Sequence, residues 1–338
     1  MIMTLLAGIA LAFAASLLAA LLALRAQVLD MPGHRSLHSA PTPRSGGIGV
    51  LAGAGAVFLF AAVQPVALPG GPALLALAAL MTALGLGDDL FAFSGRAKFA
   101  VMAVLCLAFA LWIGRPERMG LSDSLIIALP VWLAVPGAAL FLFVAINAAN
   151  FMDGSDGMLA AVLIPAGLGL AAAGLVTDVP VTSLAGIALA GGLAGFLLLN
   201  RPPAKVFAGD AGSLGAGALY GGGALAMAGE GFAGSLWLAP LFILPFLADV
   251  LLTLAKRAAG GRLSLNAHRE HAYQLLILSG WSHGRVALAY SGGALACVLA
   301  GLAAAQGPGW AGFAAFLAMT GLMSALYALI HRLVPDRP

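Results

Sequence analysis

The sequence predicts an all-α protein that crosses a membrane many times as a polytopic helix bundle. Of its 338 residues, 62% are hydrophobic and only 9% are charged, whereas soluble domains carry about 25% charged residues. Such a chain cannot cover a water-facing surface with polar side chains, so lipid must surround most of it. The whole chain, 1–338, is predicted to form one integral membrane domain.

Eleven apolar runs have a length suited to membrane helices, which need about 20 residues to cross the hydrocarbon core. Glycines and prolines mark many of the breaks between the runs. The 45 glycines also suit helices that pack closely in lipid. The predicted spans are 3–24, 47–63, 72–87, 99–113, 124–146, 158–176, 181–199, 213–229, 236–255, 286–305 and 310–331.

Lys and Arg divide unevenly between the loops at the two ends of these spans. Of the 16 residues, only Arg115 and Arg118 fall on one side. Positively charged loops stay in the cytoplasm, so the basic side is predicted to be cytoplasmic, with the N-terminus outside and the C-terminus inside. The predicted cytoplasmic loops lie near 25–46, 88–98, 147–157, 200–212 and 256–285.

An adjacent acid pair, Asp88-Asp89, lies at the inner end of the third predicted span, and Arg96 and Lys98 follow it. Neighbouring carboxylates at a membrane boundary repel each other and are costly to desolvate. A metal ion or a bound basic group would relieve both costs. The alternative is a solvated signal that ends the helix, which needs no acid pair.

A second polar segment repeats Asn and Asp at a spacing of three: Asn147 and Asn150, then Asp153 and Asp156. Residues three apart share a face of a helical turn. Four oxygen-bearing side chains on one stripe predict a hard-ligand site for Mg²⁺ or Mn²⁺, and Gly154 lets a ligand approach the backbone. An ordinary polar turn with helix caps is the alternative.

A third segment, 205–213, opens the eighth predicted span. Glycines before a helix start expose backbone N–H groups that can hold phosphate. Asp210 could anchor a metal beside that phosphate, and Phe207 could stack on a base. A plain helix N-cap explains this segment equally well when it is taken alone.

The longest inner loop contains His268, Arg269 and His271. These side chains can hold phosphate oxygens or a sugar, whereas a zinc site is disfavoured because no cysteine accompanies them. A basic loop lying on anionic lipid is the alternative. Asp249, roughly two turns inside the ninth span, is either functional or forms a buried pair with an Asn or Arg of another helix.

The inner face therefore combines carboxylates for a metal, glycine turns for phosphate and basic residues for anions. These are the parts of a phosphoryl-transfer site, with Mg²⁺, or alternatively Mn²⁺, as the expected cofactor. The sequence has no GxxxxGK[ST] loop, which disfavours a P-loop nucleotide hydrolase.

In order and spacing, these motifs resemble those of the polyprenyl-phosphate N-acetylhexosamine-1-phosphate transferase family, of the glycosyltransferase family 4 type. The resemblance covers nearly the whole chain. Its last motif is most similar to the branch that initiates O-antigen and lipopolysaccharide synthesis. The matching motifs are Asp30-x-Pro32 with Gly46-Gly47, Asp88-Asp89, Asn150-Phe-Met-Asp153-Gly-Ser-Asp156-Gly157, Phe207-Ala-Gly209-Asp210-Ala-Gly212-Ser213 and His268-Arg-Glu-His271.

The resemblance implies that a UDP-activated N-acetylated sugar gives its sugar-1-phosphate to undecaprenyl phosphate, which releases UMP and forms undecaprenyl-pyrophosphoryl-sugar. This is the first membrane step of O-antigen, lipopolysaccharide or related cell-envelope glycan synthesis, on the cytoplasmic face of a bacterial inner membrane. The implied partners are the UDP-sugar, undecaprenyl phosphate and membrane lipids, with no nucleic acid. The resemblance leaves open whether the protein forms a homodimer.

The resemblance also implies residue roles around the metal and the lipid phosphate. Asp210 would hold Mg²⁺, with Asn150 beside it. Asp88 and Asp89 would orient or deprotonate the attacking lipid phosphate, which Lys98 would bind.

Further implied roles concern the sugar nucleotide. Gly154, Asp156 and Phe207 would hold uracil, and Asp153 would support the metal and nucleotide region. Many members carry a third acid shortly after the acid pair, and this chain has none there. Three residues would close over the pyrophosphate and sugar: His268, Arg269 and His271.

A membrane transporter is the alternative function, because it too would use acids within membrane helices. It predicts polar residues at mid-bilayer depth and on both faces. Here the predicted spans are nearly free of ionisable residues and the outer loops are short. A CDP-alcohol phosphotransferase would need an arginine and two later acids in one helix, which are absent after Asp156.

Overall fold

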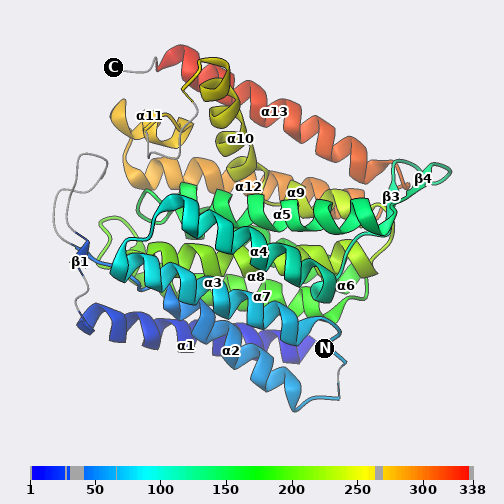
Figure 1. The fold of residues 1–338 in the computed structure, drawn as a ribbon, viewed down its shortest axis with the longest axis horizontal. Coiled ribbons are helices and arrows are strands. Elements are labelled where there is room, and N and C mark those ends of the chain that lie inside the picture. The colour runs from blue at the N-terminus through cyan, green and yellow to red at the C-terminus, as the bar shows by residue number, and fades with distance from the viewer. Residues whose placement is uncertain (1, 27–28, 31–41, 66, 263–268, 335–338) are drawn as a thin grey trace.

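The computed structural model describes residues 2–26, 29–30, 42–65, 67–262 and 269–334. Long helices, packed side by side, make up most of this part of the chain (Figure 1). The helices are α1 (Ile2–Ala26), α2 (Ile48–Ala62), α3 (Gly71–Phe91), α4 (Gly95–Ile113), α5 (Val131–Met152), α6 (Met158–Val176), α7 (Pro180–Asn200), α8 (Gly209–Glu230), the 3₁₀ turn η1 (Ser235–Trp237), α9 (Leu238–Leu241), α10 (Leu244–Ala259), α11 (Ala272–Leu278), α12 (His283–Ala304) and α13 (Ala311–Leu333).

Within the described ranges, eight helices are long and apolar enough to cross a membrane, and the bent segment 235–259 would be a ninth. Helix α2 has 15 residues, and α8 is rich in glycine and less apolar. The protein is thus a polytopic, largely helical membrane protein. The number of eleven crossings and the orientation of the termini stay predictions.

Helix α8 is the centre of the bundle, and its residues from 211 to 228 are all buried. It packs against α3, α5 and α7. Its glycines allow this close approach: a Cβ at Gly217 would lie 2.8 Å from Ile146 Cα of α5. Because α8 is shielded from lipid, it does not need the apolar side chains that the outer helices carry.

The ninth predicted span, 236–255, is not one straight helix. Its two parts, Ser235–Leu241 and Leu244–Ala259, meet at an angle of 69°. Pro245 lies in the first turn of α10, where its missing N–H and fixed φ are tolerated. The same proline inside a continuous helix would remove a hydrogen bond and clash with the preceding turn, so the helix ends and starts again.

The fifth predicted span is displaced along the chain. The structure starts α5 at Val131, after Pro130, and continues it to Met152. Residues expected in its first turn instead form the short strand β4 (Ile126–Ala128), which pairs antiparallel with β3 (Arg118–Gly120). Asn147 and Asn150 therefore lie on the last turns of a helix rather than in a loop.

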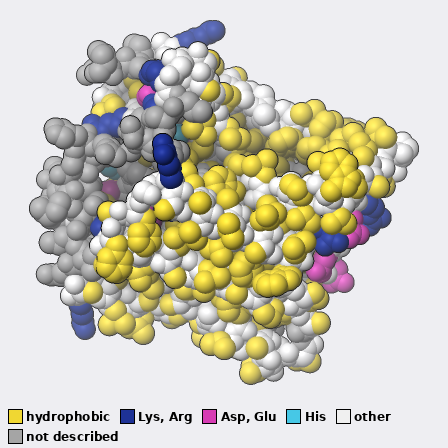
Figure 2. Space-filling model, viewed as in Figure 1, with side chains coloured by type: hydrophobic (Ala, Val, Ile, Leu, Met, Phe, Trp, Pro, Cys, Tyr) yellow, Lys and Arg dark blue, Asp and Glu magenta, His cyan; other side chains and the backbone are white. Residues whose placement is uncertain are grey.

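The described parts of the five predicted inner loops gather at one end of the bundle, together with α11 and the antiparallel pair β1 (Leu29–Asp30) and β2 (Thr42–Pro43) (Figure 1). The β3–β4 hairpin lies at the opposite end. Figure 2 shows apolar side chains over the flank of the bundle and charged ones mainly toward its ends. The side chains expected to carry chemistry thus share one end.

Adding a methyl group at Gly217 should lower stability. Gly217→Ala places a Cβ against Ile146 Cα, and overpacking of a buried contact costs about 1–3 kcal/mol. Thermal unfolding in detergent measures the effect. Gly137→Ala in α5 is the control, since no neighbour lies within 4 Å of its Cβ. Equal melting temperatures for both variants would contradict the tight α5–α8 contact.

Candidate functional site

The two adjacent acids at the end of α3 have different partners. Asp88 faces α4: its carboxylate accepts hydrogen bonds from the Phe93 backbone N–H at 2.7 Å and from Lys98 Nζ at 2.8 Å. Lys98 lies in the first turn of α4, which Ser94 caps by accepting from the Ala97 N–H. Helix α3 ends just after the acid pair, so both carboxylates lie at the rim of the bundle.

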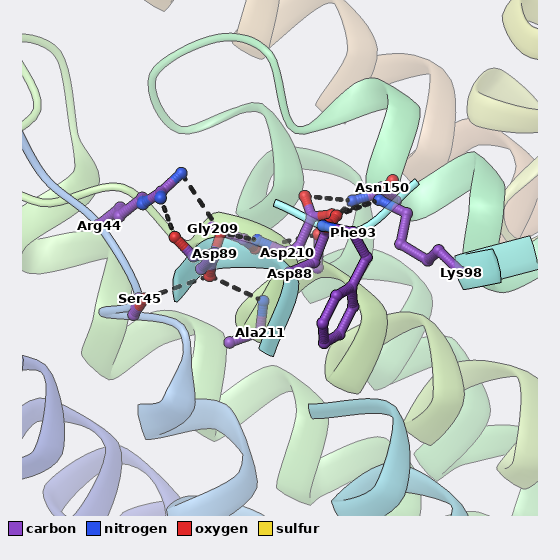
Figure 3. A network of polar contacts seen from close by, with 11 residues as sticks. Arg44, Ser45, Asp88, Asp89, Phe93, Lys98, Asn150, Gly209, Asp210 and Ala211 are labelled. Atoms are coloured by element: carbon purple, nitrogen blue, oxygen red, sulfur yellow. Dashed lines mark hydrogen bonds and ion pairs between the residues drawn. The ribbon is translucent and has the colours of Figure 1, made fainter. Parts of the chain in front are cut away.

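Asp89 turns instead toward the start of α8 and is almost fully buried. Its carboxylate accepts the backbone N–H groups of Asp210 and Ala211 at 3.1 and 3.2 Å and the Ser45 hydroxyl at 3.1 Å (Figure 3). Arg44 lies beside it and also donates to its backbone carbonyl. A carboxylate in this place stabilises the first turn of a helix.

Asp210, in the first turn of α8, contacts side chains at the ends of two other helices, α4 and α5. Lys98 Nζ lies 2.5 Å from its Oδ2, and Asn150 Nδ2 donates to its Oδ1 at 2.9 Å and to Ser213 Oγ at 2.9 Å. The preceding Gly209 has φ +69°, and a Cβ there would lie 2.5 Å from an Asp89 oxygen. Glycine is therefore needed for Asp89 to reach the helix start.

Asp153 adds a fourth carboxylate to this region. It lies in the turn between α5 and α6 and is partly buried. Desolvation raises the pKa of its carboxyl well above the usual value, and the nearby charges of Asp210 and Asp89 raise that pKa further. Four carboxyl groups thus lie in this region together with Lys98 and Arg44, and a bound cation would favour the charged forms of these carboxyl groups.

The donor set has the chemistry that Mg²⁺ prefers, since carboxylate and amide oxygens are hard ligands. Among the described residues, however, no group of three His, Cys, Asp or Glu side chains is placed to hold a metal. The Lys98 ammonium lies between Asp88 and Asp210 and links them. The metal roles of Asp210 and Asn150 therefore stay predictions.

The stripe of Asn and Asp expected from the sequence does not form one site among the described contacts. Asn147 is buried and its amide donates to the Phe143 carbonyl one turn back in α5, at 2.7 Å. Because α5 ends at Met152, the helical spacing stops before Asp153. Of the four residues of this stripe, Asn150 is the one with a described hydrogen bond to Asp210.

Asp156 contacts the loop before α8 and the start of α12. It accepts the Ala204 N–H at 3.0 Å, and its own N–H lies 3.2 Å from His283 Nδ1. The nearby Asn200 links the same loops: it accepts from the Gly157 N–H and donates to the Val206 carbonyl, both at 2.9 Å.

Gly154 and Phe207 occupy neighbouring loops without a described contact between them. Gly154 is exposed, and a Cβ there would collide with the Tyr273 hydroxyl. Phe207 is half-buried, and its backbone bonds to Pro43 and Gly46 of the N-terminal segment. Sequence reasoning assigned no role to Asn200 or His283, because a single polar residue at a helix end gives no pattern.

His271 is buried at the N-cap of α11, and its Nδ1 lies 3.1 Å from Asp249 Oδ1. Asp249 thus has a buried polar partner, which is a histidine rather than the Asn or Arg expected from the sequence. Arg269 is half-buried just before α11, and His268 lies outside the described residues. The His271 ring packs beside the Phe151 ring, with centroids 6.5 Å apart.

An apolar cavity of about 450 Å³ lies between α10, α11, α12 and α13. Apolar side chains line most of it, and Asp249 and Tyr290 are among its few polar groups. Its lining includes Ala272, the first residue of α11, so one end of the cavity lies beside His271.

Substitution of the two adjacent acids should separate their structural contributions. Asp89→Asn is expected to lower stability by about 1–2 kcal/mol, because it weakens a charged helix cap. Asp88→Asn is the matched control and should cost less, since Asp88 is more exposed and binds no helix N-terminus. Thermal unfolding of both variants measures this, and equal losses would contradict the capping role of Asp89.

Comparison with known proteins gives consistent similarities. The family model described as "Glycosyl transferase family 4" matches residues 72–228. A decaprenyl-phosphate N-acetylglucosaminephosphotransferase of Mycobacterium leprae is 30% identical over 314 residues, covering 80% of this chain and 75% of the relative. The protein of that name from Mycolicibacterium smegmatis is 31% identical over 310 residues, covering 79% of this chain and 73% of the relative. A phospho-N-acetylmuramoyl-pentapeptide-transferase of Desulforudis audaxviator is 30% identical over 299 residues, covering 81% and 88%.

Proposed function

The chain belongs to the polyprenyl-phosphate N-acetylhexosamine-1-phosphate transferase family, within glycosyl transferase family 4, and from this premise we propose that it moves an N-acetylhexosamine-1-phosphate from a UDP-sugar to undecaprenyl phosphate. The products are UMP and undecaprenyl-pyrophosphoryl-sugar. The observation that supports this most directly is the meeting of Asp88, Asp210, Asn150 and Lys98 at one end of the membrane helices.

In the proposed reaction, an oxygen of the lipid phosphate attacks the phosphorus that carries the sugar. The bond from that phosphorus to the UMP oxygen breaks, and UMP leaves. Asp88 and Lys98 are the groups best placed to meet the lipid phosphate, because they lie at the rim of the bundle. Asp89 would support them indirectly, by holding the start of α8 in place, since its oxygens already accept hydrogen bonds from Ser45 and the start of α8.

Asp210 and Asn150 would hold Mg²⁺, and Asp153 would support the metal and nucleotide region. When bound, the divalent ion would neutralise charge on the transferring phosphate groups. Lys98 would then turn from Asp210 toward the lipid phosphate. Gly154, Asp156 and Phe207 would hold the uracil, and Arg269, His271 and His268 would lie over the pyrophosphate and the sugar.

We also propose an orientation in the membrane and a place in glycan synthesis. The basic end of the bundle would face the cytoplasm of a bacterium, where sugar nucleotides are made, and the reaction would begin the assembly of O-antigen, lipopolysaccharide or a related glycan at the inner membrane. The relatives named above are transferases, which does not favour the transporter alternative.

A reconstituted assay tests the proposal. Purified protein is incubated with Mg²⁺, undecaprenyl or decaprenyl phosphate, and UDP-N-acetylglucosamine, related UDP-N-acetyl sugars or UDP-N-acetylmuramoyl-pentapeptide, and UMP release is measured. Lipid-dependent UMP release with a UDP-N-acetyl sugar is expected. No release with any donor–acceptor pair would overturn the proposal.

The metal ligands are tested by Asp210→Asn, which should lower transfer by about 1000-fold or more, because carboxylate charge for the ion is lost. Chelation of divalent ions should abolish wild-type transfer, and added Mg²⁺ should restore it. Glu117→Gln, a change of the same type at the opposite, exposed end of the bundle, is the control and should keep wild-type rates. Full activity of Asp210→Asn would remove the metal assignment.

The polyprenyl chain would lie in the apolar cavity between α10 and α13. Gly293 lines this cavity, and a Cβ there would point toward Pro245 and Met323, which line it too. Gly293→Leu should therefore raise the KM for the lipid about tenfold, equivalent to about 1.4 kcal/mol of binding, and leave the KM for the UDP-sugar unchanged.

The adjacent Gly292 provides a matched control, since its Cβ would meet no atom within 4 Å. Gly292→Leu should keep both KM values. The cavity assignment is contradicted if the two leucine variants behave alike in this steady-state assay.

A further inference from the structure

His283, the first residue of α12, contacts the turn between α5 and α6, residues 153–157. Its Nδ1 lies 2.9 Å from the Ser155 hydroxyl oxygen and 3.2 Å from the Asp156 backbone nitrogen. The Asp156 carboxylate oxygen Oδ1 is 3.8 Å from the same ring nitrogen, which is too far for a hydrogen bond. One nitrogen of His283 therefore meets two neighbouring residues of this turn.

These contacts determine which nitrogen of His283 carries the hydrogen. A backbone N–H can only donate, so Nδ1 must accept the hydrogen bond from Asp156. The Ser155 hydroxyl can rotate and donate to the same nitrogen. Nδ1 therefore carries no hydrogen, and the neutral imidazole has its hydrogen on Nε2. The link to Asp156 is then a hydrogen bond from its backbone rather than an ion pair with its carboxylate.

A serine beside a histidine can also form an activated nucleophile. That arrangement needs a third group on the other ring nitrogen, which orients the histidine as a base. Here Asp156 approaches the same nitrogen as Ser155 does, and Ser155 is buried. The pair of Ser155 and His283 is therefore built to hold the turn and not to attack a substrate.

The start of α12 does not need the His283 ring for its own stability. Ser282 caps the helix, because its side chain accepts the Arg285 backbone N–H. The ring of His283 is instead directed to a different segment of the chain. Its two hydrogen bonds thus serve the turn at Ser155 and Asp156.

Other contacts leave one carboxylate oxygen of Asp156 for a ligand. Oδ2 accepts the Ala204 backbone N–H at 3.0 Å, whereas Oδ1 has no hydrogen bond among the described residues. A carboxylate oxygen can only accept, and the uracil ring of a uridine nucleotide has a single N–H to offer it. Asn200 fixes the far end of the turn, at Gly157. The direction of Oδ1 therefore depends on how His283 holds the Asp156 backbone.

We propose that His283 is a positioning residue for the nucleotide, whose neutral Nδ1 holds the backbone of Ser155 and Asp156 so that Asp156 Oδ1 meets the uracil of the UDP-sugar. This inference rests on the proposed function for the identity of the ligand. His283 acts through the turn and not by contact with substrate. Its loss should therefore weaken nucleotide binding and leave the chemical step unchanged.

A purely structural role for His283 would give a different result. If its ring only stabilised the fold, its loss would lower the melting temperature and the amount of active enzyme. The apparent kcat would then fall, and both KM values would stay at the wild-type level. A positioning role instead raises the KM for the UDP-sugar and leaves kcat and the KM for the lipid phosphate nearly unchanged.

The kinetic test uses His283→Asn and His283→Gln as a matched pair. The amide oxygen of His283→Asn can take the place of Nδ1 and accept from the turn, whereas the longer His283→Gln carries its amide at the position of Nε2. We expect the wild-type KM for the UDP-sugar in His283→Asn and an increase of about tenfold in His283→Gln, as for the loss of one or two hydrogen bonds.

Gly284→Ala is the control for a change at the start of α12, since no neighbour lies within 4 Å of its Cβ. It should keep both KM values. Equal KM values for the UDP-sugar in His283→Asn and His283→Gln would overturn the inference, and so would an equal rise in the KM for the lipid phosphate in His283→Gln.

A binding measurement does not need turnover. UMP is titrated calorimetrically into protein in nanodiscs, and His283→Gln should bind it about tenfold more weakly than wild type and His283→Asn do. Equal affinities in wild type and His283→Gln would overturn the inference. If UMP binding follows the expected pattern but wild type releases no UMP from any UDP-sugar, the proposed transfer fails and the positioning role of His283 is supported.

A spectroscopic measurement on wild type covers the case in which His283→Gln does not fold. In histidine-selective ¹⁵N spectra at about pH 8, where a free imidazole is neutral, the His283 signal is assigned by its loss in His283→Asn. It should show the hydrogen on Nε2 and none on Nδ1. A hydrogen on Nδ1 would overturn the inference.

Discussion

The site depends on the contact between the Asp89 carboxylate and the first turn of α8. A buried carboxylate is costly unless hydrogen bonds satisfy its oxygens, and here the N–H groups of Asp210 and Ala211 and the Ser45 hydroxyl do so. This contact fixes α8 relative to α3 and to the N-terminal segment. Asp210 then lies where Asn150 of α5 and Lys98 of α4 can reach it.

A second constraint is the concentration of charge at one end of an apolar bundle. Burial raises the pKa of Asp153, and the nearby charges of Asp210 and Asp89 raise it further. Lys98 offsets part of the acidic charge by binding both Asp88 and Asp210. Such an arrangement binds cations more readily than a neutral surface does, and a bound divalent cation would in turn attract phosphate groups. The apolar flank of the bundle, in turn, confines these groups to one end of the membrane helices (Figure 2).

Much of this architecture was predictable from local sequence. Hydrophobicity locates the helices, because a helix in lipid must be apolar along its length. The break before Pro245 and the late start of α5 at Val131 were missed, since both depend on backbone geometry within continuous apolar runs. Asn150 and Asp210 were predicted to converge, whereas Asn147 binds a carbonyl of its own helix.

The sequence alone determined that this is a helical membrane protein and that its acids, amides and basic residues cluster between particular helices, because both follow from composition and from order along the chain. It did not distinguish Asp88 from Asp89, nor did it find the partner of Asp249. Only the tertiary structure decided these, since neighbouring side chains on a helix point in different directions and each meets whichever distant helix packs there.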